Sequence, residues 1–298
     1  MACRNGAAYL EEQLASIAGQ RDVDWRLIAG DDRSIDATRA ILLAFAAEWP
    51  DRVEVVQGPG AGAAAHFLAL LERAEPGAVA FADQDDVWMP GKLREALDAL
   101  AAVTEPGLFV ARVALWDGKG AGRAVAVPGN PGVKGAAALS RALVQNIGPG
   151  HAMVLNARAA EALRQLAAAG ARPVWHDWWA YQVVLGLGGR VISGCEVQVL
   201  YRQHAANLVG RAAGLAGGLR KLRRAFSGRA RDEFAAQLAA LDLGRAMLTD
   251  EARALVAGVR ALPDRGPGRA LGFWRLGLRR SGTFGRIGLA LAAGLGAI

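Results

Sequence analysis

The sequence predicts an α/β fold in which a Rossmann-like, mostly parallel sheet is flanked by helices. Three observations predict it: short apolar runs alternate with segments of helical spacing, the connections between them are short, and acidic residues directly follow two of the apolar runs. Because open parallel sheets bind ligands at the carboxyl ends of their strands, the same pattern predicts the position of a site. Of the 298 residues, 53% are hydrophobic, which is enough to bury the core of such a domain.

The elements follow one another regularly along the first part of the chain. Asn5-Gly6 is expected to form a turn, and Ser34 and Asp36 offer oxygens that can cap a helix running to about Glu48. Strands are expected at Trp25–Gly30, Val53–Val56 and Ala78–Ala82, and further helices at Ala7–Ala18 and Ala63–Ala74. Runs this short and apolar are typical of parallel strands that are covered on both faces.

The remaining sequence divides the chain into two predicted domains. Residues 118–150 are rich in Gly, Ala and Pro and are expected to form loops beside a site, and ordered elements resume over residues 151–210. Basic helical stretches predominate after that, with an amphipathic helix expected over Asp232–Val259. The prediction is an α/β domain over residues 1–210 and a helical, basic C-terminal extension over residues 211–298.

Charge is distributed unevenly between these two parts. Residues 1–201 carry 18 Lys and Arg against 22 Asp and Glu, a net charge of −4, whereas residues 202–298 carry 17 against 6, a net charge of +11. A basic region of this kind can contact phosphates on anionic lipid head groups or on nucleic acid, and nucleic acid is disfavoured because no base-reading motif is present. A solvated basic helix packed on the first domain is the third alternative. The residues that favour a lipid surface are Arg220, Lys221, Arg223 and Arg224, with Phe273-Trp274 and the segment Ile287–Ile298.

The expected location is the cytoplasm, with peripheral association with the inner face of the plasma membrane as a further expectation. Two cysteines, Cys3 and Cys195, match no disulfide or metal framework, which fits a reducing compartment. No secretory signal is apparent. The longest uncharged apolar segment, Ile287–Ile298, is shorter than the roughly 20 residues that span a bilayer.

The most informative motif is the acidic segment Asp83-Gln84-Asp85-Asp86, which directly follows an expected strand. Three carboxylates so close together repel one another unless a cation lies among them, and hard divalent cations such as Mg²⁺ or Mn²⁺ prefer carboxylate oxygens. The alternative is an acidic turn that caps the helix beginning near Pro90. Asp31-Asp32 follows a second strand, which favours a site, because both strand ends belong to the same edge of the sheet. This second pair could accept hydrogen bonds from a nucleoside, or cap the helix that follows.

Two later motifs suit sugar and phosphate chemistry. Asp177 lies among aromatic residues that can stack on sugar rings, and a carboxylate in such surroundings suits general base catalysis; core packing of the aromatic residues is the alternative. Further along, Arg202 can contact a diphosphate and His204 can complete a metal shell, although a lone histidine near a strand end is often structural.

Together these motifs resemble the family 2 inverting glycosyltransferases with the GT-A fold, and within them the bacterial rhamnosyltransferase-like branch. The resemblance extends over about residues 1–210, and the order and spacing of several motifs make it specific. Those motifs are Asn5-Gly6 with the helix start up to Leu14, Asp31-Asp32-Arg33-Ser34, Asp83-Gln84-Asp85-Asp86-Val87-Trp88, Gly150-His151, His176-Asp177-Trp178-Trp179 and Tyr201-Arg202-Gln203-His204.

The resemblance implies metal-dependent transfer of a sugar, with rhamnose as one candidate, from a dTDP- or UDP-sugar to a glycan or lipid-linked acceptor of cell-surface polysaccharide synthesis. Asp177 is implied as the general base that deprotonates the acceptor hydroxyl. Asp85 and His204 are implied as ligands of a divalent metal, Mg²⁺ or Mn²⁺. The donor-binding residues implied are Asn5, Asp31, Asp32, Asp83 and Arg202, with Asp83 toward the ribose, and the acceptor-binding residues implied are Trp178 and Trp179.

The sequence departs from the family pattern near its start. Arg33 stands where the family usually has Gly, so its side chain could bind phosphate or obstruct the base, and His66 stands near a usual Asn. Only Met1–Cys3 precede the first turn, so the first strand is expected to be truncated, through a misassigned start codon or a real loss. A truncated or inactive homologue that binds nucleotide or a partner without turnover is therefore the alternative function. A nucleotidyltransferase is disfavoured because the turn lacks a basic, Gly-rich phosphate loop.

Overall fold

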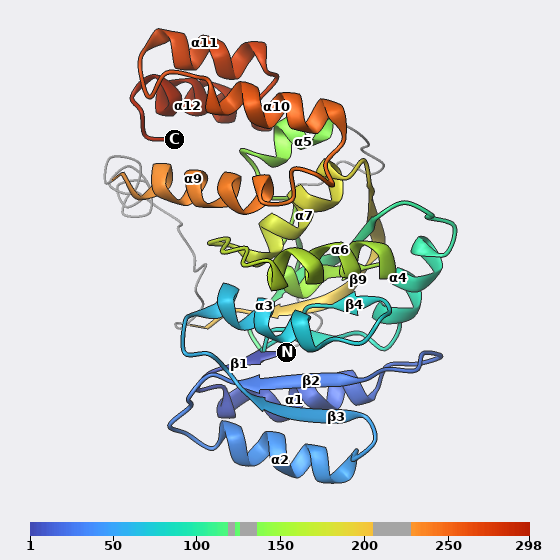
Figure 1. The fold of residues 1–298 in the computed structure, drawn as a ribbon. Coiled ribbons are helices and arrows are strands. Elements are labelled where there is room, and N and C mark those ends of the chain that lie inside the picture. The colour runs from blue at the N-terminus through green and yellow to red at the C-terminus, as the bar shows by residue number, and fades with distance from the viewer. Residues whose placement is uncertain (119–122, 126–135, 205–227) are drawn as a thin grey trace.

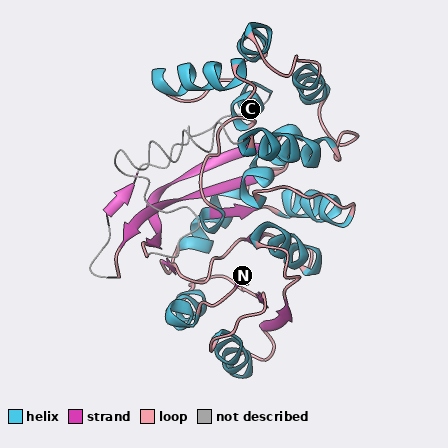
Figure 2. Cartoon of the chain, turned by 90° about the vertical axis from the view of Figure 1, so that its left-hand side faces the viewer, coloured by secondary structure: helices cyan, strands magenta, loops and turns pink. Residues whose placement is uncertain are grey.

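The structure is a computed structural model in which residues 1–118, 123–125, 136–204 and 228–298 are described. Figure 1 shows three parallel strands with their helices at one end of the molecule and the C-terminal helices at the other, and Figure 2 shows helices on both sides of the longer sheet. No helix in the described ranges is long and apolar enough to cross a bilayer.

The strands and helices alternate over the first hundred residues, as the sequence predicts. The strands are β1 (Ala2–Cys3), β2 (Leu27–Asp31), β3 (Val53–Gln57), β4 (Val79–Ala80), β5 (Val87–Trp88), β6 (Gly107–Trp116), β7 (Arg123–Val125), β8 (Met153–Leu155) and β9 (Arg190–Arg202). The helices are α1 (Ala7–Ala18), α2 (Thr38–Glu48), α3 (Ala63–Arg73), α4 (Lys92–Leu100), α5 (Ala136–Ala142), α6 (Ala157–Ala168), α7 (His176–Gly186), α9 (Arg229–Asp242), α10 (Asp250–Arg260), α11 (Pro267–Arg275) and α12 (Thr283–Gly294), with a short 3₁₀ turn at Gly150–Ala152.

The first sheet has the order β1-β2-β3 and is wholly parallel. Its register places Cys3 beside Asp31 and Asp31 beside Gln57, so the three strands end at one edge. The apolar faces of α1 and α2 supply the core here, because Leu10, Leu14 and Leu42 are almost completely buried. The carboxyl ends of these strands are thus held at fixed positions, as a ligand site requires.

The expected short first strand is a two-residue strand in the structure. Its backbone is nevertheless paired: Gly30 N–H donates to Met1 O at 2.9 Å and Asp32 N–H donates to Cys3 O at 2.8 Å. One longer hydrogen bond, from Ala2 N–H to Ala82 O at 3.4 Å, links this strand to the segment after β4. Because only this one hydrogen bond joins β1 to the segment after β4, the strands form two separate sheets.

The second sheet is mixed, which differs from the mostly parallel sheet that the sequence predicts. Its order is β4-β8-β6-β9-β5, with β7 paired to β6. The long strands β6 and β9 are parallel, whereas β4, β5, β7 and β8 pair antiparallel with their neighbours. Apolar runs alone do not distinguish the two directions, because strands covered on both faces have the same composition in either.

Helix α9 packs against α7, and α10 packs against α5 and α9. Gln237 on α9 is buried and bonds the backbone of Trp175 through both its amide oxygen and its amide nitrogen. Gly186 lies against Leu248 and accepts a hydrogen bond from Thr249 N–H. The helix start that carries Asp177 is therefore supported from the C-terminal part of the chain.

The structure divides or changes some of the elements expected after residue 118. The amphipathic segment expected as one helix over Asp232–Val259 forms two helices, α9 and α10, because the chain turns between Leu243 and Thr249, whose hydroxyl caps α10. Part of the region expected as loops forms α5. The basic stretch with Arg220, Lys221, Arg223 and Arg224 lies outside the described residues, and the division at residue 210 stays a prediction.

Candidate functional site

The carboxyl ends of β1, β2 and β4 converge around the thiol of Cys3. Burial, together with the nearby carboxylates of Asp31, Asp83 and Asp85, raises the pKa of Cys3 to about 12, against the opposing charge of the N-terminal ammonium. Carboxylates act on a neighbouring thiol in this way only over short distances. Cys3 is paired with Asp31 on one side of β1, and Ala2 N–H donates to Ala82 O, next to Asp83, on the other. The two acidic motifs, separated by about fifty positions in the sequence, therefore lie on opposite sides of one short strand.

The turn after β1 is bonded to the loop after β2. Asn5 N–H donates to Ser34 Oγ at 2.8 Å, and Asn5 Oδ1 accepts from Ile35 N–H at 2.9 Å. Gly6 N–H donates to Thr38 Oγ1 at 2.8 Å and Ala7 N–H to a carboxylate oxygen of Asp36 at 3.1 Å. Burial alone would raise the pKa of Asp36, but the hydrogen bonds of this carboxyl with Thr38 and Ala7 together lower it. Side chains of the second loop therefore fix the N-terminus of α1, and Asn5 is part of that arrangement.

Asp31 and Asp32 are both buried at the end of β2. Asp31 accepts a hydrogen bond from Ser34 N–H at 3.2 Å, and Asp32 accepts one from Gly60 N–H at 2.5 Å. His66 lies beneath them, since a Cβ at Gly30 would meet His66 Nε2 at 2.0 Å, and burial lowers the pKa of this imidazole. Only glycine leaves room at position 30 for the imidazole of His66, which packs against β2 below the two carboxylates.

Gln84 joins the acidic loop to the turn after β1. Its amide oxygen accepts from Arg4 N–H at 2.7 Å and its amide nitrogen donates to Arg4 O at 3.0 Å. A Cβ at Gly6 would lie 2.3 Å from Gln84 Oε1, so a larger residue at position 6 would displace this side chain. Gln84, the residue between Asp83 and Asp85, therefore holds the acidic loop against this turn, while the two carboxylates have other partners.

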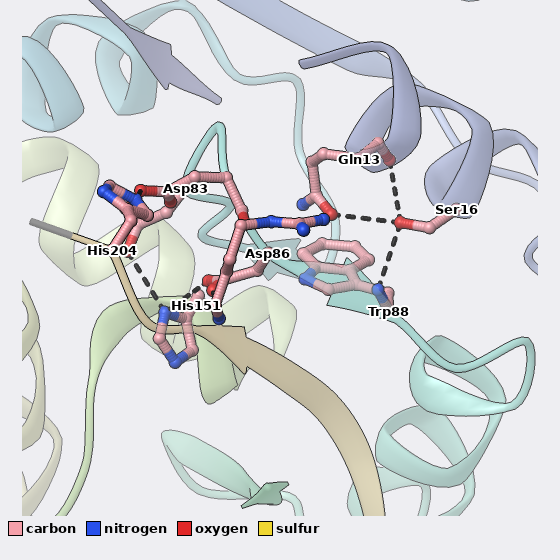
Figure 3. A network of polar contacts seen from close by, with 9 residues as sticks. Gln13, Ser16, Asp83, Asp86, Trp88, His151 and His204 are labelled. Atoms are coloured by element: carbon pink, nitrogen blue, oxygen red, sulfur yellow. Dashed lines mark hydrogen bonds and ion pairs between the residues drawn. The ribbon is translucent and has the colours of Figure 1, made fainter. Parts of the chain in front are cut away.

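Asp83 and Asp86 share the imidazole of His151 (Figure 3). His151 Nδ1 lies 3.1 Å from Asp83 Oδ2 and 2.6 Å from Asp86 Oδ2. Although burial alone would lower it, the two carboxylates raise the pKa of His151 to about 10, so the ring is positively charged at neutral pH. Burial alone would raise the pKa of Asp83, but the hydrogen bond and charge of His151 hold it below its usual range. A buried cation thus neutralises part of the acidic motif.

The same three groups also satisfy the spacing of a metal site, because their ligand atoms all lie within 4.8 Å of one another. Asp86 and His151 are, however, almost completely buried, and the charged imidazole already occupies the space between the carboxylates. A metal ion could bind here only if the imidazole released its proton. In this structure the cluster orients Asp83 through its contact with His151.

Asp85 and His204 form the second contact of the acidic motif. His204 Nε2 lies 2.7 Å from Asp85 Oδ2, and each side chain retains about one sixth of its surface exposed. Burial raises the pKa of Asp85, and the neighbouring charges of Asp86 and Asp83 raise it further. A carboxylate and an imidazole at the edge of a negatively charged cluster are suitable donors for a divalent cation, which would relieve that repulsion. The residues present therefore fit the metal that the sequence implies.

Arg202 lies behind this pair. Its Nε donates to Asp85 O at 3.0 Å, one terminal nitrogen pairs with Glu12, and its guanidinium lies over the rings of Trp116 and Tyr9. Tyr9 in turn stacks on the ring of His204, with 4.8 Å between the ring centroids. The side chain of Arg202 is largely buried, so in this structure it positions the acidic loop; its expected contact with a diphosphate stays a prediction.

Asp177 lies in the first turn of α7, next to the same cluster. Its carboxylate accepts hydrogen bonds from Asn146 Nδ2 at 3.2 Å and from Trp178 N–H at 2.7 Å. His176 anchors this turn by stacking on Phe67, with ring centroids 3.9 Å apart. A Cβ at Gly150 would meet His176 Nε2 at 2.7 Å and Asp177 Cβ at 3.3 Å, so this glycine allows the start of α7 to approach the turn that carries His151.

The two tryptophans expected to bind an acceptor lie in different environments. Trp179 has no exposed surface, so it belongs to the core and is not available to stack on a sugar in this structure. For Trp179, core packing, which the sequence analysis gives as the alternative to sugar stacking, is therefore correct. Trp178 is half-buried and its indole N–H donates to Ala142 O, which directs the ring toward α5. Its contact with an acceptor stays a prediction.

Several residues of the site have no role in the sequence analysis. Asp86 and His151 form the buried pair, Glu12 binds Arg202, and Asn146 binds Asp177. Asp86 and His151 could be suspected from the sequence, because they lie inside quoted motifs. Glu12 lies inside the motif that ends at Leu14, but its pairing with Arg202, 190 positions away, leaves no local signal, and nothing in the sequence marks Asn146.

Arg33 shows why a glycine suits its position. Its backbone φ is 63°, in the left-handed region that disfavours side chains with a Cβ. The exposed guanidinium covers Gly60, where a Cβ would lie 2.7 Å from Cζ. The side chain therefore lies over the loop that binds Asp32, beside the edge where a nucleoside is expected.

Two solved structures with a similar fold contain nucleotide sugars. The chain is similar to the Staphylococcus aureus protein TarS in complex with UDP-GlcNAc (TM-score 0.53, 14% identity, covering 88% of this chain and 80% of that one). It is also similar to the mannosyltransferase PcManGT from Pyrobaculum calidifontis in complex with GDP-Man and Mn²⁺ (TM-score 0.51, 19% identity, covering 98% of this chain and 84% of that one). The fold is the GT-A type, with sheets flanked by helices.

The sequence comparison is narrower and more specific. Residues 1–115 match the family model of glycosyl transferase family 2. The dTDP-rhamnosyl transferase RfbG of Shigella flexneri is 34% identical over 105 residues, which are 34% of this chain and 36% of that protein. The match thus spans about a third of the length of this relative. Over residues 1–115 the chain is therefore similar to family 2 glycosyl transferases.

Proposed function

We propose that this protein is a metal-dependent inverting glycosyltransferase that moves a sugar from a nucleoside-diphosphate donor to an acceptor hydroxyl. One observation carries the proposal: the acidic loop after β4 brings Asp83, Asp85 and His204 together beside the ends of β1 and β2. Such an arrangement provides carboxylate and imidazole donors next to a surface that can hold a nucleoside. The family 2 domain and the GT-A fold support the same class of reaction.

In this proposal the donor lies along the edge formed by the two strand ends. Asp31, Asp32 and Asn5 line the nucleoside half, and Asp83 lies between that half and the metal ligands. His151 keeps Asp83 ionised and fixed, so that its free oxygen can accept hydrogen bonds from ribose hydroxyls. A divalent cation held by Asp85 and His204 would neutralise the diphosphate of the donor and stabilise it as a leaving group.

Asp177 is proposed as the general base. Its carboxylate removes the proton from the acceptor hydroxyl as that oxygen forms a bond to the anomeric carbon. The bond from the anomeric carbon to the diphosphate oxygen breaks, and the nucleoside diphosphate leaves with the electron pair. A single displacement of this kind inverts the anomeric configuration. The hydrogen bond from Asn146 holds the carboxylate in place at the start of α7.

The finer assignments rest on relatives. RfbG is described as a dTDP-rhamnosyl transferase, which makes a dTDP-sugar, with rhamnose as one candidate, our first choice of donor. UDP and GDP donors are the next choices, because the similar structures contain UDP-GlcNAc and GDP-Man. We propose a glycan or lipid-linked acceptor in cell-surface polysaccharide synthesis, and a cytoplasmic location where nucleotide sugars are available.

Binding of nucleotide without turnover is the second candidate function. Arg33 favours it, because its side chain covers the loop that binds Asp32 and could restrict the position of a donor base. Nucleotide binding that is not followed by transfer or by hydrolysis of any donor sugar would support this alternative.

The first experiment is calorimetric titration of dTDP and UDP in the presence and absence of Mn²⁺. We expect binding that depends on the metal, and Asp85→Asn should weaken it by about 100-fold, because it removes a charged ligand of the cation. Asp51→Asn is the matched control, since this exposed carboxylate precedes β3 at the opposite edge of the sheet. Equal metal-dependent binding by both variants would contradict the assignment of Asp85.

A further inference from the structure

Helix α12 exposes a continuous apolar row. Phe284, Ile287, Leu291 and Leu295 are 92%, 53%, 61% and 60% exposed and recur at intervals of three and four residues, so they form one stripe along the helix. The opposite side of α12, with Leu289 and Ala293, is buried. A helix that is apolar on both sides and packed on only one has an unpartnered face.

The neighbouring helix α11 adds to this surface. It packs against α12 and exposes Leu271 and Trp274, three positions apart, while Phe273 between them is buried. The guanidinium of Arg279 lies 5.9 Å from the ring of Trp274. Both helices lie at the end of the molecule opposite the first sheet (Figure 1), so the apolar rows are remote from α2 and β3.

The charged residues within α11, α12 and the segments that join and follow them are all basic. Residues 265–298 contain six arginines and neither aspartate nor glutamate. Arg269 is occupied inside the fold, donating to Ile298 O and Pro263 O. Arg275, Arg279 and Arg286 are exposed, and none of the ion pairs between described residues involves them. The apolar rows are therefore bordered by cations without an internal counterion.

A basic hollow opens beside the apolar rows. It has a volume of about 460 Å³ and lies between α5, α10 and the end of α11, lined by Arg141, Arg275 and Arg279 with Ser140, Leu255 and Gly277. Three guanidinium groups around one open cavity favour an anionic group with several oxygens. Two of these arginines also border the apolar rows, which connects the two features into one surface.

We propose that α11, α12 and the basic hollow form a docking surface for an anionic lipid bilayer. The apolar row enters the boundary between head groups and acyl chains, and the hollow receives a phosphate of a lipid head group, as amphipathic basic helices at membrane surfaces do. A second copy of this chain would bring like charges together, and a nucleic acid would leave the apolar rows exposed to water. A bilayer satisfies both features at once.

The docking surface does not depend on the proposed reaction, although its link to a lipid-linked acceptor does. If docking is correct, the transferase domain is held at the surface on which such an acceptor lies. Docking is therefore measured without donor, acceptor or turnover, so that its failure and the failure of the proposed function can be distinguished.

The experiment is flotation of the full chain with vesicles of phosphatidylcholine alone and of phosphatidylcholine containing about one third phosphatidylglycerol. We expect binding to the anionic vesicles that decreases with added salt, because surface attraction is screened within a Debye length. Phe284→Ser with Leu291→Ser removes two residues of the row, and Arg275→Gln with Arg279→Gln removes two charges of the hollow. Each pair should reduce binding about 10-fold or more.

Controls come from the other end of the molecule. Leu43→Ser with Arg39→Gln changes an exposed leucine and an exposed arginine on α2, and binding should not change. Thermal unfolding of every variant shows whether it remains folded. Binding that ignores lipid charge, or that the α2 variant reduces equally, overturns the proposal. So does a dimer, detected by sedimentation without lipid, that the α12 pair dissociates, because the row would then be covered by a second copy.

Inorganic pyrophosphate separates a lipid surface from a free anion. At millimolar concentration it should compete only partly with anionic vesicles, because it cannot replace the apolar contacts. Complete displacement of the protein by pyrophosphate, with the Phe284→Ser and Leu291→Ser pair binding vesicles normally, would show that the hollow binds a soluble anion and would overturn docking.

Discussion

The acidic loop after β4 and the C-terminal helices differ in whether their charged side chains have partners of opposite charge. In the acidic loop each carboxylate has a cationic or hydrogen-bonding partner: His151 for Asp83 and Asp86, and His204 for Asp85. In residues 265–298, six arginines have no acidic residue among them. The first region balances its charge internally over long sequence separations, whereas Arg275, Arg279 and Arg286 of the second form no ion pair with another described residue.

The difference shows that side-chain positions are fixed in the acidic loop and are not fixed in the basic helices. Buried charges stay ionised only when partners hold them, so the pairs around Asp83 and Asp85 set the positions of the groups that the reaction needs. Exposed arginines cost little to keep and attract a surface without defining one orientation. Substitutions should therefore have large effects in the acidic region and small effects on stability in the basic one.

The largest effect is expected for Asp177→Asn. Removal of a general base lowers the rate of proton transfer, so kcat should fall by about 10²- to 10⁴-fold while donor binding stays unchanged. Steady-state kinetics and donor titration measure the two quantities separately. A loss of donor affinity equal to the loss in kcat would assign Asp177 to binding.

The next largest effect is expected for His151→Gln. This change leaves Asp83 and Asp86 close together without the cation between them, and should destabilise the protein by about 3–5 kcal/mol. Urea unfolding measures it, with Arg279→Gln in the basic region as the comparison. That exposed substitution should change stability by less than about 0.5 kcal/mol. Similar losses in both variants would break the contrast between the regions.

A pH-dependent effect is expected for Lys92, which is fully buried with Nζ 3.4 Å from the centroid of the Trp88 ring. Burial lowers its pKa from 10.5 to about 7, opposed by Asp86. Between pH 7 and 10.5 the unfolded chain therefore binds more protons at this lysine than the folded chain does. The free energy of unfolding gains up to about 1.4 kcal/mol per pH unit from this group as pH rises through that window.

Lys92→Met tests this linkage. The stability of the wild type relative to the variant should increase with pH across the window and stay constant below it, because both states of the wild type are then protonated. Urea unfolding at several pH values measures the difference. A constant difference at all pH values would mean that Lys92 keeps its usual pKa when folded.

The smallest effect is expected for Arg33→Gly. Glycine tolerates the φ of 63°, so the substitution should stabilise the protein by up to about 1 kcal/mol. Arg33→Ala is the control, because it removes the guanidinium but retains the Cβ and should bring no such gain. Thermal unfolding compares the two, and donor titration shows whether the guanidinium obstructs or aids nucleotide binding. Equal stability of both variants would show that the stability change comes from loss of the guanidinium and not from relief of the backbone conformation.

The alternation of strands and helices in the first hundred residues is readable in the sequence, because it depends on local periodicity. The predicted helices Ala7–Ala18 and Ala63–Ala74 agree with α1 and α3 almost to the residue. The second sheet is less readable: β4 and β8 pair antiparallel, although the apolar run containing β4 has the composition of a parallel strand. Strand direction depends on connections that come later in the chain.

The sequence by itself determined which strand ends carry carboxylates, because a buried apolar run that stops at Asp31 or Asp83 marks both the strand and its end. Only the tertiary structure decided how those carboxylates are divided: Asp85 meets His204, 119 positions away, while Asp83 meets His151 and Gln84 bonds the turn at Arg4. It also decided that Trp179 is core and Asp177 lies by the acidic loop. Local periodicity specifies elements and their faces, whereas partners brought together by packing across a hundred residues leave no local signal.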